Sequence, residues 1–404
     1  MTVMRIAFFS DSFYPHVDGV TSYIRVVTEA LIAKGHEVLI VAPKRAEATL
    51  LATQRFAPGA KVLLAPGVKM FFYPDFCFGA PSPKVLFAVR KFTPDVIHFH
   101  TPTFLGMQAI MMAKVLKVPL ITTFHTYYME PEGFVAIGIK STGKVAELLQ
   151  ESLWKVSEQI HNPCDVVVAP TEYVGKDLKK RWKKVEVEVI PGAVELSPFG
   201  NQSNREMLRT KYKLGKGVVF LSVGRLSPEK NHETIMTSFA MILMKHPDAK
   251  LVFVGDGLGR KDLEYLAGVL GIRDSVVFVG NVPYQTLTKQ NYYAMGDVFV
   301  TASTWDTQGL SVVEAMAAGL PVVALKYRAM PEVVGRGGIL ASFGDPRSFA
   351  RAMSELAGKK QLMQRLGACA QSEAQKYKID THVERLEKLY ARLILAKKLE
   401  QDGK

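Results

Sequence analysis

The stretch RIAFFSDSFYPHVDGVTSYIRVVTEALIAKGHEVLIVA, residues 5–42, decides the fold class. An apolar run of five residues leads into a polar loop, an amphipathic segment, Val20–Lys34, and a second apolar run, Glu37–Ala42. Apolar side chains recur at helical spacing in the amphipathic segment, and Gly35 ends it. A strand, a helix and a strand in this order predict a βαβ unit and therefore a parallel sheet.

The second half of the chain repeats this plan. We expect a strand at Val218–Val223, a loop at Gly224–Asn231, a helix at His232–Lys245 and a strand at Lys250–Gly255. The remaining predicted strands are mostly continuous Val, Ile and Phe runs, as expected where helices cover both faces of a sheet. They are Val96–Phe99, Leu120–Thr123, Val166–Ala169, Val187–Ile190, Val276–Val279, Val298–Thr301 and Pro321–Ala324.

The length of 404 residues suits two domains. The polar stretch Ser197–Asn204 reads as a linker, so the sequence predicts two doubly wound α/β domains, residues 1–195 and 196–380, facing a cleft. A last helix at Thr381–Lys398, capped by Asp380 or Thr381, is expected to return residues 381–404 to the first domain.

The chain carries 51 Lys and Arg against 38 Asp and Glu, a net charge of +13. Such an excess admits nucleic acid, an anionic membrane or a phosphorylated ligand. No RNA-binding aromatic signature or helix-turn-helix cue accompanies it, which argues against nucleic acid. The three cysteines lie far apart and favour a reducing compartment over a disulfide framework. No apolar stretch is long enough to span a membrane, so a cytoplasmic location is expected.

Residues 298–324, VFVTASTWDTQGLSVVEAMAAGLPVVA, hold the sharpest candidate site. Asp306 lies in the loop after a strand, and Glu314 is expected in the first turn of a helix beginning near Ser311. Backbone N–H groups ahead of that helix suit an anionic group, and a carboxylate there suits a ligand hydroxyl. Spacing alone is equally compatible with a turn formed by Asp306 and with Glu314 complementing the helix dipole.

Two further segments carry candidate chemistry. Arg225 and Lys230 flank a strand-to-helix loop, where they could neutralise a diphosphate leaving group, although surface charge on a loop would look the same. His125 follows an apolar strand, and His98 and His100 end the neighbouring strand. No Cys or Asp set with metal spacing accompanies these histidines, so no metal site is predicted.

Together these segments resemble the retaining GT-B glycosyltransferases of family 4 over nearly the whole chain. The Glu-(seven residues)-Glu motif of that family aligns with Asp306 and Glu314, and its Gly-Arg-Leu-x-x-x-Lys pattern with Gly224–Lys230. The strand-end histidine aligns with His125 and the first-loop glycine with Gly19. The resemblance implies the GT-B fold, with two Rossmann-like domains. Asp306 departs from the usual Glu, which leaves the donor hexose open.

The resemblance also implies roles for individual residues. Arg225 and Lys230 would hold the donor diphosphate, Asp306 the sugar hydroxyls, and His125 the sugar beside the reacting edge. These four are the implied catalytic residues. The implied donor-binding residues are Gly19, Gly224, Gln308, Gly309, Leu310, Glu314 for the ribose, and Val282 in the loop facing the base.

Within the family, the stretches Thr123–Tyr128 and Asp306–Ser311 look most like enzymes that glycosylate diacylglycerol or related lipids. That subgroup uses UDP-sugars, commonly UDP-glucose, and no bound cofactor. The predicted function is therefore retaining transfer of a hexose from a nucleotide-sugar to a lipid, on the inner face of the cell membrane. A soluble transferase with a sugar acceptor and a nucleotide-sugar epimerase are the alternatives.

Two segments are candidates for an anionic membrane surface. The stretch Lys69–Lys91 interleaves cations with aromatic residues, although its prolines argue against one regular amphipathic helix, and its aromatics could pack under a loop instead. Lys176–Lys184 holds six basic residues against one acidic residue, a pattern that a solvated helix face also shows. The residues singled out are Phe71, Phe72, Phe76, Lys179, Lys180 and Arg181.

Overall fold

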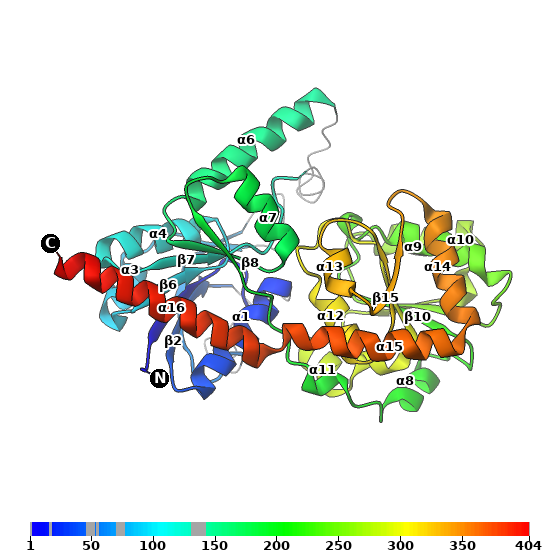
Figure 1. The fold of residues 1–404 in the computed structure, drawn as a ribbon. Helices are drawn as coiled ribbons and strands as arrows, with labels where there is room; N and C mark the ends of the chain where they lie inside the picture. The colour runs from blue at the N-terminus through cyan, green and yellow to red at the C-terminus, as the bar shows by residue number, and fades with distance from the viewer. Residues whose placement is uncertain are drawn as a thin grey trace. The chain divides into compact units, whose positions relative to one another are not determined.

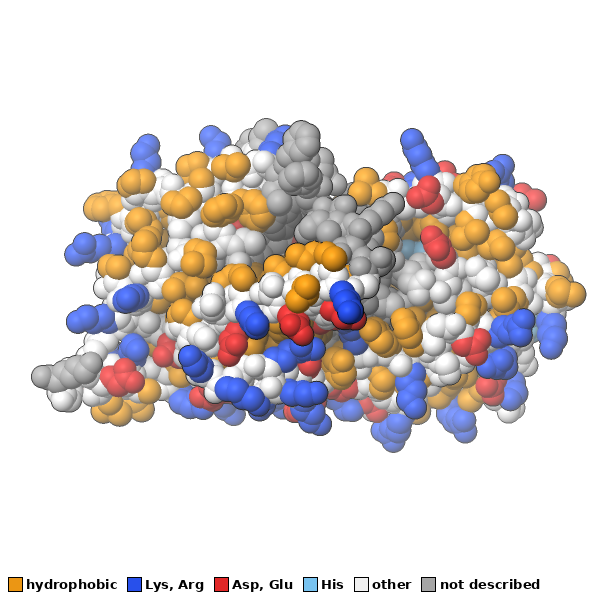
Figure 2. Space-filling view, turned by 90° about the horizontal axis from the view of Figure 1, so that it is seen from above, with side chains coloured by type: hydrophobic (Ala, Val, Ile, Leu, Met, Phe, Trp, Pro, Cys, Tyr) orange, Lys and Arg blue, Asp and Glu red, His pale blue; other side chains and the backbone are white. Residues whose placement is uncertain are grey.

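A computed structural model describes residues 2–15, 18–45, 53, 56–69, 77–130 and 143–403. The chain divides into two compact units (Figure 1). Unit 1 combines the described residues up to Ala193 with those from Ile379 onwards, and unit 2 is Val194–Lys378. Lys and Arg side chains are spread over the surface in Figure 2, in keeping with the net charge of +13.

The sheet of unit 1 has seven parallel strands in the order β3-β2-β1-β6-β7-β8-β9. Phe8 in the middle of the sheet lies opposite Ile40 on one side and His98 on the other. The strand order reverses between β1 and β6, so this sheet is doubly wound as predicted. The strands are β1 (Arg5–Phe9), β2 (Glu37–Pro43), β3 (Lys61–Ala65), β6 (Val96–Phe99), β7 (Leu120–Thr123), β8 (Val166–Ala169) and β9 (Glu186–Val189).

Helices cover both faces of this sheet (Figure 1). Crossovers between parallel strands are right-handed, so connections that run in opposite directions along the sheet place their helices on opposite faces. The helix after β1 therefore lies on one face, and the helices beyond the reversal lie on the other. The first face carries α1 (Gly19–Ala33) and α16 (Ile379–Asp402), which pack on each other. The second carries α3 (Pro83–Phe92), α4 (Phe104–Leu116), α6 (Lys144–His161) and α7 (Glu172–Arg181).

A buried carboxylate ties the loops at the reversal point of unit 1. Asp11 follows β1 and accepts hydrogen bonds from the backbone N–H groups of Gly79 (2.6 Å) and Leu105 (3.1 Å) and from the hydroxyl of Thr101 (3.2 Å). Gly79 ends β5 (Cys77–Gly79), which pairs antiparallel with β4 (Gly67–Lys69). Asp11 thereby fixes this hairpin and the start of α4 to the edge of the sheet.

The last helix is held on unit 1 by buried polar contacts as well as by apolar packing. Val383, Leu386 and Leu389 of α16 belong to the same core as the inner face of the sheet. His382 is hydrogen-bonded to the Tyr23 hydroxyl (2.8 Å), and the Tyr390 hydroxyl to Nδ1 of His98 (2.7 Å). The helix begins at Ile379, so the expected cap at Asp380 or Thr381 is wrong, and both residues lie inside its first turn.

The sheet of unit 2 has six parallel strands in the order β12-β11-β10-β13-β14-β15, with the reversal between β10 and β13. Successive side chains of a strand point to opposite faces, so Phe220 of β10 joins one core and Leu221 the other. The strands are β10 (Val219–Val223), β11 (Lys250–Val254), β12 (Val276–Gly280), β13 (Val298–Thr301), β14 (Val322–Leu325) and β15 (Gly338–Ala341).

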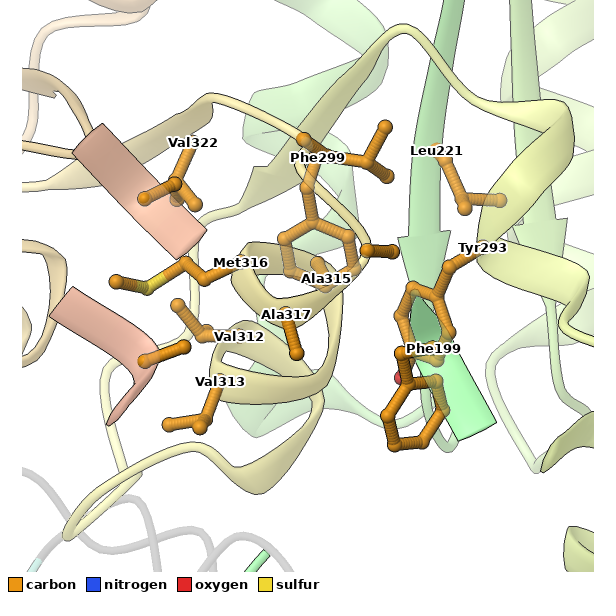
Figure 3. Packing of buried hydrophobic residues seen from close by; sticks show 14 of the residues in the cluster. Phe199, Leu221, Tyr293, Phe299, Val312, Val313, Ala315, Met316, Ala317 and Val322 are labelled. Atoms are coloured by element: carbon orange, nitrogen blue, oxygen red, sulfur yellow. The ribbon is translucent and has the colours of Figure 1, made fainter. Parts of the chain in front are cut away.

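The core on one face of this sheet surrounds α12 (Leu310–Ala317), whose residues 312–317 are all buried (Figure 3). Phe299, Val322 and Tyr293 pack around it. A helix that is apolar all round requires such complete enclosure. The same face carries α8 (Arg205–Lys211), α13 (Met330–Val334) and α15 (Lys360–Ala374), and α11 (Tyr284–Lys289) precedes this part of the chain. The opposite core involves α9 (His232–Leu243), α10 (Arg260–Val269) and α14 (Pro346–Gly358).

One local expectation needs correction. The stretch Ser197–Asn204 is no loose linker, because Ser197–Phe199 forms a short 3-10 helix and Phe199 is fully buried in the core of unit 2. The described residues of Lys69–Lys91 form no single helix, as its prolines indicated, and Pro83 begins α3, since the first helical position needs no N–H donor. Among the described residues, no helix combines the length and the apolarity needed to cross a bilayer.

We predict that acid loosens the attachment of α16. Burial lowers the pKa of His125 and of His382 from 6.5 to about 4. The folded chain therefore binds fewer protons than the unfolded chain between pH 6.5 and 4, so stability is complete above pH 6.5 and falls as the pH approaches 4. At about 1.4 kcal/mol per pKa unit, the loss reaches roughly 3 kcal/mol for each histidine.

Thermal unfolding of unit 1, measured between pH 7 and pH 5, checks this expectation. His382→Gln should flatten the dependence of Tm on pH. His246→Gln, which changes a histidine of unit 2 bonded to Ser354 (3.2 Å), should leave the slope as it is. An unchanged slope in His382→Gln would contradict the assignment.

Candidate active site

The loops after β10 and β13 meet at the strand reversal of unit 2. In a doubly wound sheet, ligands bind where neighbouring strands send their connections to opposite faces. The loop after β10 carries Arg225 and Lys230, and the loop after β13 carries Asp306. The two charged motifs found in the sequence are thus brought together by the topology of one sheet.

A direct ion pair joins these two loops. The ammonium of Lys230 lies 2.6 Å from Oδ1 of Asp306, and the side chains are 26% and 20% exposed. Burial alone would raise the pKa of Asp306, but Lys230, a hydrogen bond from Ser303 and the charge of Arg225 together lower it. Asp306 is therefore an anion at neutral pH that faces two cations.

Backbone contacts hold the same two loops in register. Glu229 is buried, and its carbonyl accepts a hydrogen bond from the backbone N–H of Thr304 (3.2 Å). Its side chain accepts a hydrogen bond from the Ser227 hydroxyl (2.5 Å). This role of Glu229 was not predicted, because a single acid beside a proline does not indicate burial.

Glycine is required where the ends of β10 and β11 approach each other. Gly224 has φ +147° and Gly255 has φ +141°, and a Cβ on Gly255 would lie 1.9 Å from the Gly224 carbonyl oxygen. A side chain at position 255 would push the loop after β10 out of place, whereas at position 224 it is the backbone conformation alone that favours glycine. The Gly224 of the motif is thereby explained by its φ angle.

Glu314 is held by two phenols. The Tyr284 hydroxyl donates to Oε1 (2.8 Å) and the Tyr293 hydroxyl to Oε2 (2.5 Å). Burial and the neighbouring Glu314 raise the pKa of Tyr293 well above its usual value, so it stays a donor. The helix begins at Leu310, so Glu314 lies in the second turn of α12 rather than the first. The contact of the two tyrosines with Glu314 was not predicted.

The other predicted donor-binding residues of unit 2 surround the same helix start. Gln308 is buried, Gly309 caps α12 with φ +75°, and Leu310 is its first residue. Leu310 and Val282 both pack partly against the core of this face. The first backbone N–H groups of α12 therefore lie beside Asp306, while the part of Val282 in base recognition stays a prediction.

In unit 1, His125 belongs to a cluster of buried rings. It follows β7, and its Nε2 lies 3.1 Å from Nδ1 of His100, which follows β6. The Tyr23 ring meets both imidazoles at centroid distances of 5.0 Å for His125 and 5.4 Å for His100. His98 lies 4.4 Å from His100 between ring centroids. Gly19 is the first residue of α1, directly after its capping residue.

The hydrogen bond between His100 and His125 fixes their protons. Burial lowers the pKa of both imidazoles, so both are neutral at pH 7 and each carries one proton. Nε2 of His100 is buried with no partner among the described residues, and an N–H there would be a costly orphaned donor. We therefore assign the proton of His100 to Nδ1, donating to Nε2 of His125, which leaves the proton of His125 on Nδ1.

In the described part of the chain, no group of His, Cys, Asp or Glu side chains is arranged to hold a metal ion. The histidine cluster consists of neutral rings bonded to each other and to hydroxyls. This arrangement suits hydrogen bonding to an uncharged ligand group such as a sugar.

The predicted membrane residues are only partly described. Lys179 and Lys180 are exposed on α7. Arg181 is bound to Asp177 (3.1 Å), and its guanidinium lies over the Trp154 ring at 4.1 Å from the centroid. The aromatic residues Phe71, Phe72 and Phe76 lie outside the described residues.

Residues 17–198 match the "Glycosyltransferase Family 4" model, and residues 204–373 match "Glycosyl transferases group 1". Alpha-monoglucosyldiacylglycerol synthase of Streptococcus pneumoniae is 35% identical over 332 residues, covering 80% of this chain and 71% of that protein. The chain belongs to the family 4 glycosyltransferases. It is accordingly a hexosyltransferase that uses a nucleotide-sugar.

Other relatives of this glycosyltransferase span more of the chain at lower identity. Alpha-monoglucosyldiacylglycerol synthase of Acholeplasma laidlawii is 25% identical, covering 97% of this chain and 98% of that protein. The crystal structure of Anabaena HepE in complex with UDP-glucose has a TM-score of 0.77 at 20% identity, covering 96% and 100% of the two chains. This likeness confirms the predicted GT-B fold, with its seven- and six-stranded parallel sheets.

We expect Asp306→Asn to weaken catalysis by this glycosyltransferase by about 100-fold in kcat/KM, the scale of losing one charged contact in a desolvated site. The amide keeps the shape but removes the charge that faces Lys230. Steady-state kinetics with a nucleotide-sugar check this, and Asp345→Asn, which changes an exposed helix cap of unit 2, is the control. Equal kcat/KM in both variants would rule out a role for Asp306.

We expect His100→Ala to lower kcat by about 10-fold with little change in KM for the donor, because one hydrogen bond contributes about 1 kcal/mol and about 1.4 kcal/mol is a factor of ten in rate. His100→Asn, whose amide N–H replaces the Nδ1 donor, should recover most of the rate. If the Asn variant is as slow as the Ala variant although both fold, His100 only fills space. Nitrogen chemical shifts of His125 should report loss of its Nδ1–H tautomer in the Ala variant alone.

Proposed function

We propose that this enzyme transfers glucose from UDP-glucose to diacylglycerol or a related glycolipid, with retention at the anomeric carbon. The similarity to two alpha-monoglucosyldiacylglycerol synthases carries the acceptor assignment, because one of them is similar over 97% of this chain. The complex of HepE with UDP-glucose supports the donor. Unit 2 would bind the nucleotide-sugar and unit 1 the acceptor.

The ion pair between Lys230 and Asp306 supports a specific mode of donor binding. A diphosphate carries more charge than one carboxylate, so it attracts Lys230 and Arg225 more strongly than Asp306 does. Asp306 then turns to the sugar hydroxyls, together with the backbone N–H groups of Gln308, Gly309 and Leu310. Lys230 and Arg225 thereby change partner from the Asp306 carboxylate to the diphosphate, which is the leaving group.

The proposed reaction takes place on one face of the sugar. The bond from the anomeric carbon to the diphosphate oxygen breaks, and a bond from the same carbon to the acceptor hydroxyl oxygen forms. The hydroxyl proton passes to an oxygen of the departing diphosphate. Arg225 and Lys230 stabilise the charge that develops there, which lowers the barrier without an enzyme nucleophile.

The remaining candidate residues orient the donor. Glu314, which its two tyrosines hold in place, accepts hydrogen bonds from the ribose hydroxyls. Val282 lies beside the base. The family resemblance assigns a sugar contact to His125 and a phosphate contact to Gly19, and both assignments are part of the proposal. The enzyme needs no bound cofactor for this chemistry.

A second donor has its own support. GDP-mannose-dependent alpha-mannosyltransferase of Mycolicibacterium smegmatis is 30% identical over 329 residues, covering 80% of this chain and 79% of that protein. Asp306 stands where Glu is usual, so the pocket for the sugar hydroxyls differs by one methylene. A sugar acceptor and epimerisation of a nucleotide-sugar are the remaining alternatives.

A panel of UDP- and GDP-sugars with diacylglycerol, a glycolipid and free sugars tests the proposal. We expect a glucosylated lipid with α linkage from UDP-glucose alone. Transfer only to free sugars would refute the lipid acceptor, and a changed nucleotide-sugar without transfer would identify an epimerase. Anomeric analysis of the product by NMR tests retention.

Arg225→Ala should reduce kcat with UDP-glucose by about 100- to 1000-fold, because one cation facing the departing diphosphate is lost. Arg351→Ala, which removes an arginine that is 71% exposed and paired with Asp345, serves as the matched control and should keep full activity. Intact turnover in Arg225→Ala would remove this residue from the mechanism.

A further inference from the structure

Two phenols from different elements bind the carboxylate of Glu314, which is 5% exposed in the second turn of α12. The hydroxyl of Tyr284, the first residue of α11, donates to Oε1 (2.8 Å), and the hydroxyl of Tyr293 donates to Oε2 (2.5 Å). Burial of a carboxylate costs free energy unless hydrogen bonds replace those that water made. The two hydroxyls therefore help to keep this charge inside an otherwise apolar helix.

The two phenols differ in how deeply they lie. Tyr293 is fully buried, and its ring contacts those of Phe199 and Phe299 at centroid distances of 5.4 Å and 6.1 Å (Figure 3). Tyr284 is half-buried. Tyr293 is thus fixed by the core around it, whereas Tyr284 holds the carboxylate from the rim of that core.

The helix that carries Tyr284 is held in place without the Tyr284 hydroxyl. The carbonyl of Pro283 accepts hydrogen bonds from the backbone N–H groups of Thr286 and Leu287 (2.9 Å each). Leu287 is buried in the core of unit 2. Val282, to which the family resemblance gives a contact with the base, lies two residues before Tyr284. Loss of the hydroxyl should therefore change the contact with the carboxylate and leave α11 where it is.

Phenols orient a carboxylate without cancelling its charge. An ionised carboxylate accepts about four hydrogen bonds, two on each oxygen, and the two phenols use one position on each oxygen. A guanidinium would instead bind both oxygens and neutralise them. Glu314 is thus fixed in orientation as a pair of charged acceptors.

We propose that Tyr284 is a positioning residue through which Glu314 selects ribose over 2′-deoxyribose in the donor nucleotide. A vicinal diol presents two hydroxyl donors side by side, which match the two oxygens of one oriented carboxylate. A site built to bind a hydroxyl discriminates strongly against an analogue that lacks it. The substrate class is therefore the ribonucleoside diphosphate sugars, and sugars linked to 2′-deoxythymidine diphosphate are excluded. This role of Tyr284 rests on the proposed contact of Glu314 with the ribose.

The same hydrogen bonds could serve only to tie α11 to α12. The two roles differ in what the ligand must contain. A positioning role acts through the ribose hydroxyls, so it disappears with a ligand that lacks them. A structural role would weaken the binding of every nucleotide alike.

Calorimetric titration of the full-length protein with UDP and with 2′,3′-dideoxy-UDP tests the proposal. Tyr284→Phe removes only the hydroxyl, and Tyr265→Phe makes the same change at a tyrosine of α10 that is 75% exposed. We expect Tyr284→Phe to weaken UDP binding about 10-fold, the scale of one hydrogen bond, and to change binding of the dideoxy ligand by less than about 2-fold. The control variant should match the natural chain with both ligands.

Steady-state kinetics give a second readout. The ribose is remote from the anomeric carbon, so its contacts are made equally in the ground state and the transition state. Tyr284→Phe should therefore raise KM for UDP-glucose about 10-fold and leave kcat within about 2-fold. The natural chain should prefer UDP-glucose to 2′-deoxy-UDP-glucose at least about 10-fold in kcat/KM, and the variant should lose most of this preference.

Equal weakening of UDP and of the dideoxy ligand by Tyr284→Phe would assign a structural role to the residue and overturn the proposal. Equal binding of the two ligands by the natural chain would overturn it as well, and that comparison needs no variant. GDP and its 2′,3′-dideoxy form give the same comparison for a chain that prefers guanine, because the ribose is the same. Circular dichroism and Tm check that both variants fold.

The binding measurements need no acceptor, so they separate the role of Tyr284 from the proposed function. A ligand-dependent loss in Tyr284→Phe, together with no glucosylation of any lipid, would refute the lipid acceptor and leave the role of Tyr284 in place. Glucosylation of diacylglycerol by a chain that binds UDP and the dideoxy ligand equally would leave the proposed function in place and refute the role of Tyr284.

Discussion

The reversal of strand order in each sheet is the constraint on which the rest of the structure depends. Right-handed crossovers force the helices on either side of the reversal onto opposite faces, so the two loops at that point have no helix between them. In unit 2 this brings Lys230 and Asp306, 76 positions apart, within 2.6 Å. Unit 1 repeats the pattern, where Asp11 joins the loops after β1 and β6. Function therefore depends on topology before it depends on any single side chain.

The predictable parts of the fold are those whose signal is local. The strands at Val96–Phe99, Leu120–Thr123 and Val166–Ala169 were predicted at their observed bounds, because buried parallel strands are short continuous apolar runs. The edge strands β3 and β15 were missed, although the other two edge strands, β9 and β12, were predicted to within one residue at each end. The helix α3 was missed because Pro83 looks like a breaker unless its position in the helix is known.

The site was predictable to the extent that its motifs lie in loops after strands. Arg225, Lys230, Asp306 and Glu314 are visible as charges at such ends, but their pairing is not, because it depends on which strands are neighbours. Nothing in the sequence indicates that Tyr284 and Tyr293 bind Glu314. Residue type alone does not distinguish a tyrosine that binds a carboxylate from one that only fills the core. The contact of His100 with His125 was predictable in part, because the two histidines follow the ends of adjacent strands.

Charge and neutrality are distributed differently in the two units. At the strand reversal of unit 2, Lys230 stays partly exposed and paired with Asp306, because a fully buried cation would lose its charge or need a permanent partner. In unit 1, burial keeps His100 and His125 neutral, so their rings act as hydrogen-bonding groups and carry no charge. Many other Lys and Arg side chains are spread over the surface, where they stay in water. The net charge of +13 is therefore a sum over separate places, which is why the total alone could not distinguish a phosphate ligand from a membrane.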